Sequence, residues 1–263
     1  MEQRPYQTIL VDASDGVATL TINNPDRKNP LGPQSVNELI WALDDAKEDP
    51  EVRVVVLTGA GKAFSAGADL KQMSSGDGGD EPALESRGDY VDLLTRFTTL
   101  GKPTLARVPG PAMGGGLGIV ASCDFAIACE SAVLGTPEIR RGLWPMMIMA
   151  VLQRVVPRRK LMSMMLLGEK LSAAQALDHG LLSHVVPDAE LDDRVGEIAG
   201  KLAKQSPTAM RMGLAAFHHQ ADQDLVDALP YLRDQLFALL GTEDAQEGLM
   251  AFLQKREPVW KGK

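Results

Sequence analysis

The chain has 263 residues and a formal net charge of −8, with 44% hydrophobic and 24% charged residues. These values predict a globular protein of one large domain, or one domain with an appendage, whose core needs neither a metal nor a disulfide. The acidic balance, without a basic stripe, excludes a nucleic-acid-binding surface. A few local cations would still suffice to bind a phosphate-bearing ligand.

The cysteines and the N-terminal residues favour a reducing compartment. Cys123 and Cys129 stand in an apolar run without metal or disulfide spacing, which is typical of buried, reduced thiols. Residues 1–5 lack the apolar segment of a secretory signal, and no apolar run approaches the ~18 residues that a membrane span needs. We therefore expect a cytoplasmic protein without membrane association.

The first half of the chain predicts alternating strands and helices. Residues 8–13 and 16–22 are expected to pair as a hairpin, and Ser35 is expected to cap a helix with Glu38 completing a capping box. The remaining pattern predicts a strand at 52–58, a loop at 74–81, a helix at 84–100, a strand at 104–108, a helix at 117–122, and strands at 125–128 and 132–135.

After Leu143 the pattern changes to helices alone, without a detectable internal repeat. These helices are predicted at 146–156, 158–167, 172–180, 188–205, 207–219, 222–240 and 242–254. The order of strand, helix and strand in the first half predicts crossover units and an α/β fold. The strand-rich first half and the helical tail therefore suggest a core followed by a helical appendage.

Two glycine-bearing segments, residues 62–70 and 109–118, carry the strongest chemical signal. Each follows a β-branched apolar run and leads into a helix-like pattern. Glycines most often serve tight turns and close packing. Two helix starts with bare backbone can, however, aim two N–H groups at one oxygen and stabilise a carbonyl oxygen that gains negative charge. Neither segment has the spacing of a phosphate loop or of a dinucleotide-binding loop.

Glu138 is the best-placed carboxylate for proton transfer. It follows Gly135-Thr136-Pro137 at the end of a predicted strand and precedes an apolar segment. The ordinary fate of a glutamate is a solvated surface position. A glutamate that is desolvated at this place would instead have a raised pKa and could carry a proton.

Four segments in order resemble motifs of the enoyl-CoA hydratase/isomerase (crotonase) superfamily. They are Phe64-Ser65-Ala66-Gly67-Ala68-Asp69-Leu70, Pro111-Ala112-Met113-Gly114-Gly115-Gly116, Thr136-Pro137-Glu138-Ile139 with Gly142-Leu143-Trp144-Pro145, and the tail over residues 247–256. The resemblance covers nearly the whole chain. It implies that residues 1–195 form a spiral of ββα units with the CoA and active site. Residues 196–263 would then be a helical region that assembles a homotrimer or homohexamer.

The resemblance also implies roles for single residues. The backbone N–H groups of Ala68 and Gly115 would bind the thioester oxygen of an enolate, and Glu138 would move a proton at the neighbouring carbon. The matching positions near substrate or CoA are Lys28, Ala66, Asp69, Leu70, Gly114 and Lys255. Coenzyme A would be part of the thioester substrate, so the resemblance implies neither a permanently bound cofactor nor a metal.

The methionine-rich segment after Pro145 has two possible roles. Methionines at helical spacing usually pack in a core, and this role is favoured for residues 162–165. Residues 146–149 could instead form a soft apolar wall around the acyl group, with Trp144 as its cap. We therefore include Trp144 and Met146 among the candidate substrate-binding residues.

Gly118 is the main departure from the family pattern. Hydratases of the family carry a second glutamate there, which activates water together with the first. A single glutamate fits a proton shuttle, so we expect an enoyl-CoA double-bond isomerase, with enoyl-CoA hydratase as the close alternative. Glu85 or Asp89 could supply a second carboxylate, although a solvated helix face is the favoured role of both. An acyl-CoA hydrolase or decarboxylase and a non-catalytic acyl-CoA-binding protein are further alternatives.

Overall fold

A six-stranded sheet forms the centre of the computed structural model, which describes residues 1–70, 72 and 83–263. The loop predicted at 74–81 lies outside these residues. In spatial order the strands are β1 (Ile9–Ser14), β2 (Val17–Ile22), β4 (Val54–Gly59), β6 (Thr104–Val108), β8 (Phe125–Cys129) and β11 (His184–Val186). The predicted hairpin is confirmed, because β1 and β2 pair antiparallel; every later pair in this sheet is parallel.

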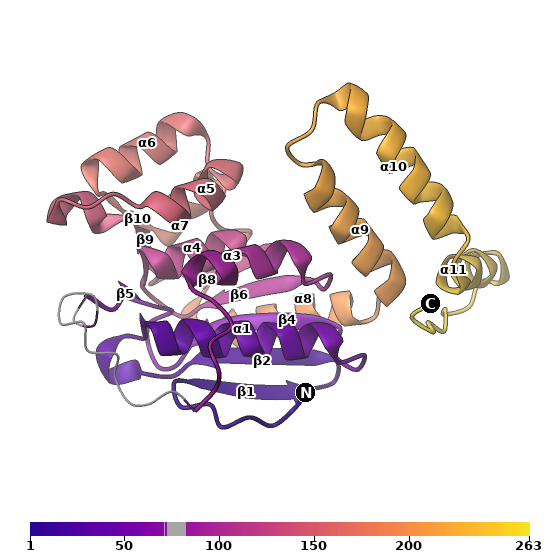
Figure 1. The fold of residues 1–263 in the computed structure, drawn as a ribbon, viewed down its shortest axis with the longest axis horizontal. Coiled ribbons are helices and arrows are strands. Elements are labelled where there is room, and N and C mark those ends of the chain that lie inside the picture. Colours follow the sequence, from indigo (N-terminus) through magenta and orange to yellow (C-terminus); the bar gives the residue numbers. More distant parts are fainter. Residues whose placement is uncertain (71, 73–82) are drawn as a thin grey trace.

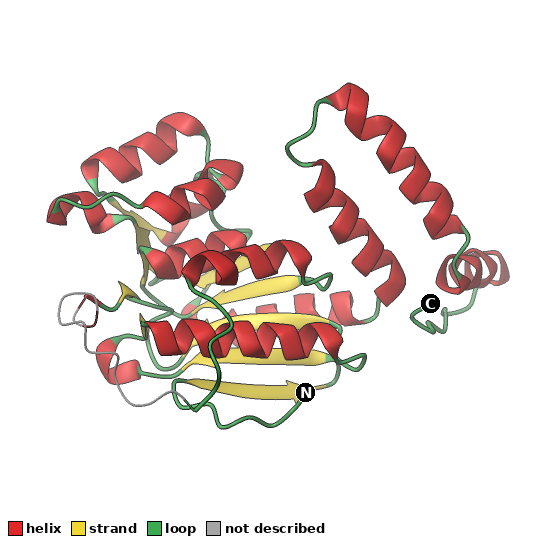
Figure 2. Ribbon diagram, viewed as in Figure 1, coloured by secondary structure: helices red, strands yellow, loops and turns green. Residues whose placement is uncertain are grey.

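Helices cover both faces of this sheet. Helix α1 (Pro33–Glu48) packs on β1 and β2, whereas α8 (Leu191–Ala203) packs on β4, β6 and β8. Figures 1 and 2 show α1 in front of the strands and α8 behind them. Because the inner strands are covered on both sides, β4 is buried along its whole length, as its run of valines and leucine predicts.

A ββα unit recurs four times along the first part of the chain. Each unit has a long strand in the main sheet, then a short strand beside it, then a helix. The units are β2, β3 (Pro30–Leu31) and α1; β4, β5 (Gly67–Ala68) and α3 (Tyr90–Thr99); β6, β7 (Ala112–Met113) and α4 (Gly115–Ser122); and β8, β9 (Val133–Gly135) and α5 (Met146–Val155). The predicted α/β spiral of ββα units is therefore confirmed.

Two further short strands correct the expectation of helices alone after Leu143. Strand β10 (Lys170–Ser172) pairs antiparallel with β9, and β11 extends the main sheet parallel to β8. Three residues each are too few for the alternating pattern by which a strand is predicted. Other described elements of the chain are the short turns η1 (Pro25–Arg27), η2 (Pro137–Arg141) and η3 (Asp188–Glu190), together with α6 (Arg158–Leu167) and α7 (Ala173–Asp178).

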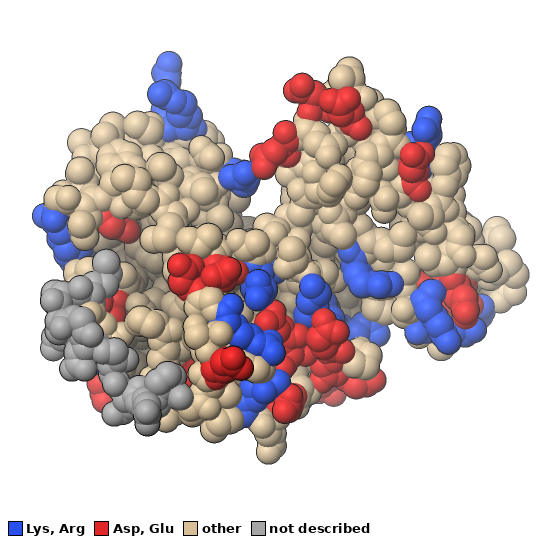
Figure 3. Space-filling model, viewed as in Figure 1, with Lys and Arg blue, Asp and Glu red and all other residues tan. Residues whose placement is uncertain are grey.

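The C-terminal helices α9 (Pro207–Gln220), α10 (Leu225–Leu240) and α11 (Glu243–Gln254) extend away from the sheet. Helix α9 contacts α3, and α10 and α11 then pack on α9 and on each other. Figure 3 shows charges of both signs interspersed around α1, whereas the surface over α9 and α10 is largely uncharged. The boundary predicted at residue 195 falls inside α8, and its status as a domain boundary stays a prediction.

The start of α1 differs from the predicted capping box. Gly32 is the residue that precedes the helix, and Ser35 is its third residue, where its Oγ accepts a hydrogen bond from the Gly32 N–H at 3.0 Å. Glu38 is buried and faces the N-terminal segment instead. Its carboxylate accepts hydrogen bonds from the Thr8 N–H at 2.8 Å, the Thr8 hydroxyl at 2.7 Å and the Ile9 N–H at 3.2 Å.

Replacement of Glu38 by alanine should therefore destabilise the fold. The change would leave these buried donors without an acceptor, and we expect the free energy of unfolding to fall by about 3 kcal/mol. Urea unfolding followed by circular dichroism measures the loss. Glu48→Ala, at the exposed end of the same helix, is the matched control and should change stability by less than ~0.5 kcal/mol. Equal stability of both variants would contradict the anchoring role of Glu38.

Candidate active site

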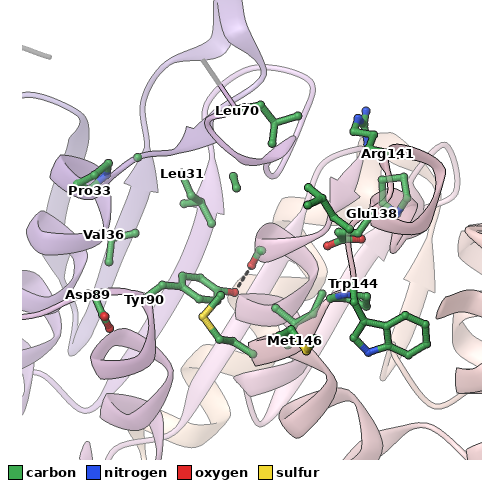
Figure 4. A pocket seen from close by; sticks show the side chains of 18 of the residues that line it. Leu31, Pro33, Val36, Leu70, Asp89, Tyr90, Glu138, Arg141, Trp144 and Met146 are labelled. Carbon is green, nitrogen blue, oxygen red and sulfur yellow. Dashed lines mark hydrogen bonds between the residues drawn. The ribbon is translucent and has the colours of Figure 1, made fainter. Parts of the chain in front are cut away.

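A cavity of about 490 Å³ opens where the short strands, α3, α4 and α5 meet. Among the candidate site residues, its lining includes Ala68, Leu70, Gly115, Glu138, Trp144 and Met146. The walls are mainly apolar, and Figure 4 shows Tyr90 projecting into the pocket from one side while Glu138 and Trp144 lie on the other. Residues that lie far apart in the sequence thus meet around one space of the size of a small ligand.

Ala68 reaches the cavity because the backbone around it is held in place. Ala66 N–H donates to the Lys28 carbonyl at 2.8 Å, Gly67 N–H to Ser65 Oγ at 3.1 Å, and Asp69 N–H to the Leu31 carbonyl at 2.9 Å. Gly67 has a φ of 90°, and a β-carbon there would lie 2.7 Å from the Met113 carbonyl oxygen. Glycine is therefore required at 67 to bring β5 against β7.

Gly115 is the first residue of α4, so its N–H belongs to the turn whose amides have no acceptor within the helix. The preceding Gly114 has a φ of 50° and donates its N–H to the Gly135 carbonyl at 3.0 Å. A β-carbon at Gly67 would lie 3.4 Å from the Gly115 nitrogen, so the two glycine-bearing segments are direct neighbours. Ala68 and Gly115 thus line the same cavity from adjacent stretches of backbone.

Glu138 lies in η2, directly after β9, and its carboxylate faces the glycine run. A β-carbon at Gly114 would lie 2.8 Å from Glu138 Oε1, so the glycine leaves room for this carboxylate. Glu138 Oε2 is buried, and none of the described residues hydrogen-bonds to it. Behind it, the buried Thr136 hydroxyl donates to the Met164 carbonyl at 3.0 Å and fixes the start of the turn.

Burial raises the pKa of Glu138 above the ordinary glutamate value, because the apolar surroundings disfavour the charged carboxylate. Its own backbone N–H and the charge of Arg141 act in the opposite direction and lower the pKa. An apolar pocket with one carboxylate of raised pKa and a free oxygen is suited to taking a proton from carbon and returning it.

The space above Gly118 is filled by two other side chains. A β-carbon at 118 would lie 2.4 Å from the Tyr90 hydroxyl oxygen and 2.4 Å from Ile148 Cγ2. A glutamate at this position would therefore displace both side chains. Tyr90 donates a hydrogen bond to the Gly115 carbonyl at 2.5 Å, shown as a dashed line in Figure 4. Sequence reasoning missed Tyr90, and it expected Ile148 only within the apolar wall at 146–149, because only the fold brings α3 and α5 against Gly118.

The other carboxylates that were weighed do not take the place of a second glutamate in the described structure. Asp89 lines the cavity, but it caps α3 by accepting the Val91 N–H at 2.7 Å, and it lies beyond Tyr90 from Glu138 in Figure 4. Glu85 is exposed, and its backbone carbonyl accepts the Trp41 indole N–H at 2.8 Å. Within the described residues, the carboxylate that faces the glycine run is therefore Glu138.

The apolar wall comes from the segment after η2. Met146, 62% exposed, and its neighbours Met147 and Ile148 line the cavity, and Trp144 lies at the same wall. Met149 instead accepts the Trp144 indole N–H at its sulfur at 3.4 Å. In the second cluster Met164 and Met165 are buried in the core. Met146 and Trp144 therefore both lie in the apolar wall of the cavity.

The positions predicted to contact CoA fall in two separate places. Lys28 and Ala66 are exposed and adjacent, joined by the backbone hydrogen bond described above. Asp69 is buried beside them, and its carboxylate forms an ion pair with Arg27 at 2.8 Å. Lys255 lies at the end of α11, and Figure 1 places α11 and β5 at opposite sides of the chain. Within one chain, the tail lysine is therefore remote from the cavity.

No group of three or more metal-binding side chains gathers within residues 1–70, 72 and 83–263. The histidines of the chain also lie away from the cavity lining.

Comparisons with known proteins agree with this geometry. The enoyl-CoA hydratase/isomerase family model matches residues 12–263. The enoyl-CoA hydratase domain-containing protein 3, mitochondrial, of Xenopus laevis is 35% identical over 251 residues, which cover 95% of this chain and 85% of that protein. The probable enoyl-CoA hydratase echA8 of Mycobacterium bovis is 34% identical over 254 residues, which cover 96% of this chain and 97% of that protein.

Solved structures give the same result in three dimensions. An enoyl-CoA hydratase from Bacillus anthracis matches with a TM-score of 0.89 at 32% identity, covering 98% of this chain and 100% of that one. The human enoyl-CoA hydratase domain-containing protein 3 matches with a TM-score of 0.86 at 32% identity, covering 97% and 100%. The pocket, the strand order and these similarities over the full length lead to one conclusion: the chain belongs to the enoyl-CoA hydratase/isomerase family.

Proposed function

We propose that this chain catalyses a double-bond shift in an enoyl-CoA thioester, with Glu138 as the single proton carrier. The observation that carries the proposal is the space above Gly118, which Tyr90 and Ile148 fill in place of a second carboxylate. The buried, unpaired oxygen of Glu138 supports its role as the base. The neighbouring backbone segments at Ala68 and Gly115 support their role as the oxyanion donors.

The proposed reaction begins with a 3-enoyl-CoA whose thioester oxygen accepts hydrogen bonds from the Ala68 and Gly115 amides. The Glu138 carboxylate takes a proton from C2, and the electron pair of the broken C–H bond moves onto the thioester oxygen as a dienolate. The two amides stabilise this charge because they are oriented before it forms. The protonated Glu138 then returns the proton to C4, which leaves a conjugated 2-enoyl-CoA.

Hydration of a 2-enoyl-CoA is the second candidate, favoured by the names of the relatives. Both the Bacillus anthracis structure and the Mycobacterium bovis relative are described as enoyl-CoA hydratases. Hydration here would need water activated by Glu138 with no second carboxylate at position 118. For this reason we place it after isomerisation. The alternatives of an acyl-CoA hydrolase, a decarboxylase or a binding protein gain no specific support from the pocket.

We also propose that Lys28, Ala66, Asp69, Leu70 and Gly114 form the CoA-proximal side of the site and that Lys255 completes it from a second copy of the chain. The separation of Lys255 from the cavity within one chain supports the second part. CoA would be part of the substrate rather than a resident cofactor.

Assembly through the C-terminal helices is proposed on the basis of their unpartnered apolar side chains. In α10, sixteen residues long, Ala228 is the one buried residue. Large apolar side chains exposed on α10 and α11 are Leu225, Val226, Leu229, Leu236, Phe237, Leu240, Leu249, Met250, Phe252 and Leu253. Apolar surface of this extent is typical of an interface. The number of copies, three or six, is the part of the proposal that the family resemblance implies.

None of the helices in the described part of the chain combines the length and hydropathy needed to cross a membrane. The cytoplasmic location stays a prediction, because the relatives include a mitochondrial protein.

A panel of CoA thioesters separates the candidate reactions. With a 3-enoyl-CoA substrate, the absorbance of the conjugated thioester should rise, because isomerisation brings the double bond next to the carbonyl. Hydration of a 2-enoyl-CoA would make the same absorbance fall, and a malonyl-type substrate tests decarboxylation. If the absorbance falls with 2-enoyl-CoA and does not rise with 3-enoyl-CoA, the protein is a hydratase and the proposed isomerisation is wrong. Tight binding without turnover of any member would indicate a binding protein.

Glu138→Gln should lower turnover by ~10²–10⁴-fold while CoA-thioester binding persists, because the amide keeps the shape but cannot carry the proton. In the unmodified protein the base must be ionised, so the rate should rise with pH through the raised pKa of Glu138 and be lost below it. Stopped assays across pH measure both effects. Glu130→Gln, at an exposed position, is the control. Unchanged turnover in Glu138→Gln would remove this residue from the mechanism.

Light scattering tests the proposed assembly. We expect a mass three or six times the 28.3 kDa of one chain. Replacement of the exposed Phe252 and Leu253 by aspartate should shift the mass towards that of single chains, because charges would be buried at the interface. Aspartate at the exposed Leu10, on β1, is the matched control and should leave the mass unchanged. A monomeric unmodified protein would contradict the proposal.

A further inference from the structure

The Tyr90 hydroxyl is a polar group in an otherwise apolar part of the pocket. Tyr90 is the first residue of α3 and is partly buried against the core, with its ring directed at the start of α4. Its hydroxyl donates to the carbonyl oxygen of Gly115 at 2.5 Å. It therefore touches the same residue whose N–H is the proposed oxyanion donor.

The backbone of the glycine run has no side chains of its own to restrain it. Gly114, Gly115 and Gly116 follow one another without side chains, so the direction of each amide depends on contacts from outside. Gly114 N–H is held by the Gly135 carbonyl at 3.0 Å, on one side of the run. Gly116 packs against Ser65, since a β-carbon there would lie 2.5 Å from Ser65 Cβ. The Gly115 N–H belongs to the Gly114–Gly115 peptide, whose carbonyl accepts the Gly118 N–H at 3.0 Å. Tyr90 holds the next peptide, through the Gly115 carbonyl.

The position of Tyr90 is itself fixed by its surroundings. Asp89 caps α3 and sets the start of the helix, and the ring lies 3.6 Å from where a β-carbon at Gly115 would stand. The absence of a side chain at Gly118 leaves the space that the hydroxyl occupies. Burial, with the nearby Glu138 charge as a smaller contribution, raises the Tyr90 pKa. The hydroxyl therefore keeps its proton and remains a donor.

We propose that Tyr90 is a positioning residue that fixes the backbone conformation of Gly115, and with it the direction of the Gly115 N–H towards the thioester oxygen, because its hydrogen bond to the Gly115 carbonyl holds the peptide on the C-terminal side of this residue. An oxyanion donor acts by being aimed before charge develops, and small misplacements of reacting groups are costly. The kinetic part of this inference rests on the proposed function. The spectroscopic part requires only that an acyl-CoA binds in the pocket.

The test is Tyr90→Phe, which keeps the ring and removes the hydroxyl. The probe is 4-dimethylaminocinnamoyl-CoA, whose absorbance band moves to longer wavelength as its thioester carbonyl is polarised. We expect Tyr90→Phe to bind the probe with similar affinity but with a clearly smaller red shift. With a substrate that turns over, kcat should fall on the order of 10- to 100-fold while KM changes little. A purely structural role would lower thermal stability and leave the red shift intact.

Two control variants define the full red shift and its near-complete loss. Tyr6→Phe removes a hydroxyl that donates to Asp45 at 3.3 Å, away from the cavity, and should leave the red shift unchanged. Gly115→Pro removes the amide hydrogen at the first helix position, where proline is tolerated, and should abolish most of the shift. If Tyr90→Phe does not fold, Gly118→Ala displaces the hydroxyl from the other side and should give the same loss.

A full red shift in folded Tyr90→Phe or folded Gly118→Ala would overturn the inference. So would an unmodified protein that binds the probe without any shift, or that fails to bind it. If instead the shift depends on Tyr90 while no CoA thioester is turned over, the proposed reaction fails and the positioning role stands.

Discussion

Parallel pairing between the short side strands is the constraint on which the whole site depends. Ala68 pairs with Leu31, Ser65 bridges to Ala112, and Met113 pairs with Gly135. The proposed functional groups stand at the same place in three consecutive ββα units: Ala68 ends β5, Gly115 follows β7, and Glu138 follows β9 after a short link. The main sheet supplies the rigid layer beneath. A repeated backbone pattern thus assembles two amide donors and one carboxylate.

Close approach of backbone to side chain is the second requirement, and it explains why glycines gather here. Gly67 and Gly114 adopt positive φ angles, and Gly114 and Gly116 leave room for the Glu138 carboxylate and for Ser65. A side chain at such a position would be unfavourable for two reasons, because the backbone angle disfavours it and because neighbouring atoms occupy its space. The same contacts desolvate Glu138 and raise its pKa, which couples the packing of the pocket to its chemistry.

The sequence predicted the parts of this arrangement that leave a local pattern. The hairpin, the strand at 104–108 and most helices follow from periodicity, and the glycine motifs indicated Ala68 and Gly115. Periodicity did not show the side strands β3, β5 and β7, which have two residues each, so the ββα units were expected from the family resemblance alone. The Ser35 cap was wrong because a glycine and a proline start α1 one turn earlier in the chain. Tyr90 and Ile148 carry no motif and meet only through tertiary packing.

The crowded space above Gly118 also constrains how this pocket can change by mutation. A glutamate introduced at 118 alone collides with Tyr90 and Ile148, so its effect cannot be read as that of a restored second carboxylate. Smaller residues at 90 and 148 would have to come first, and the first of these steps gives up the hydrogen bond to Gly115. Neighbouring substitutions of this kind are not additive. If the proposed mechanism holds, a mutational path from one-carboxylate to two-carboxylate chemistry would cross an intermediate of low activity, and the order of the substitutions would decide how low that activity becomes.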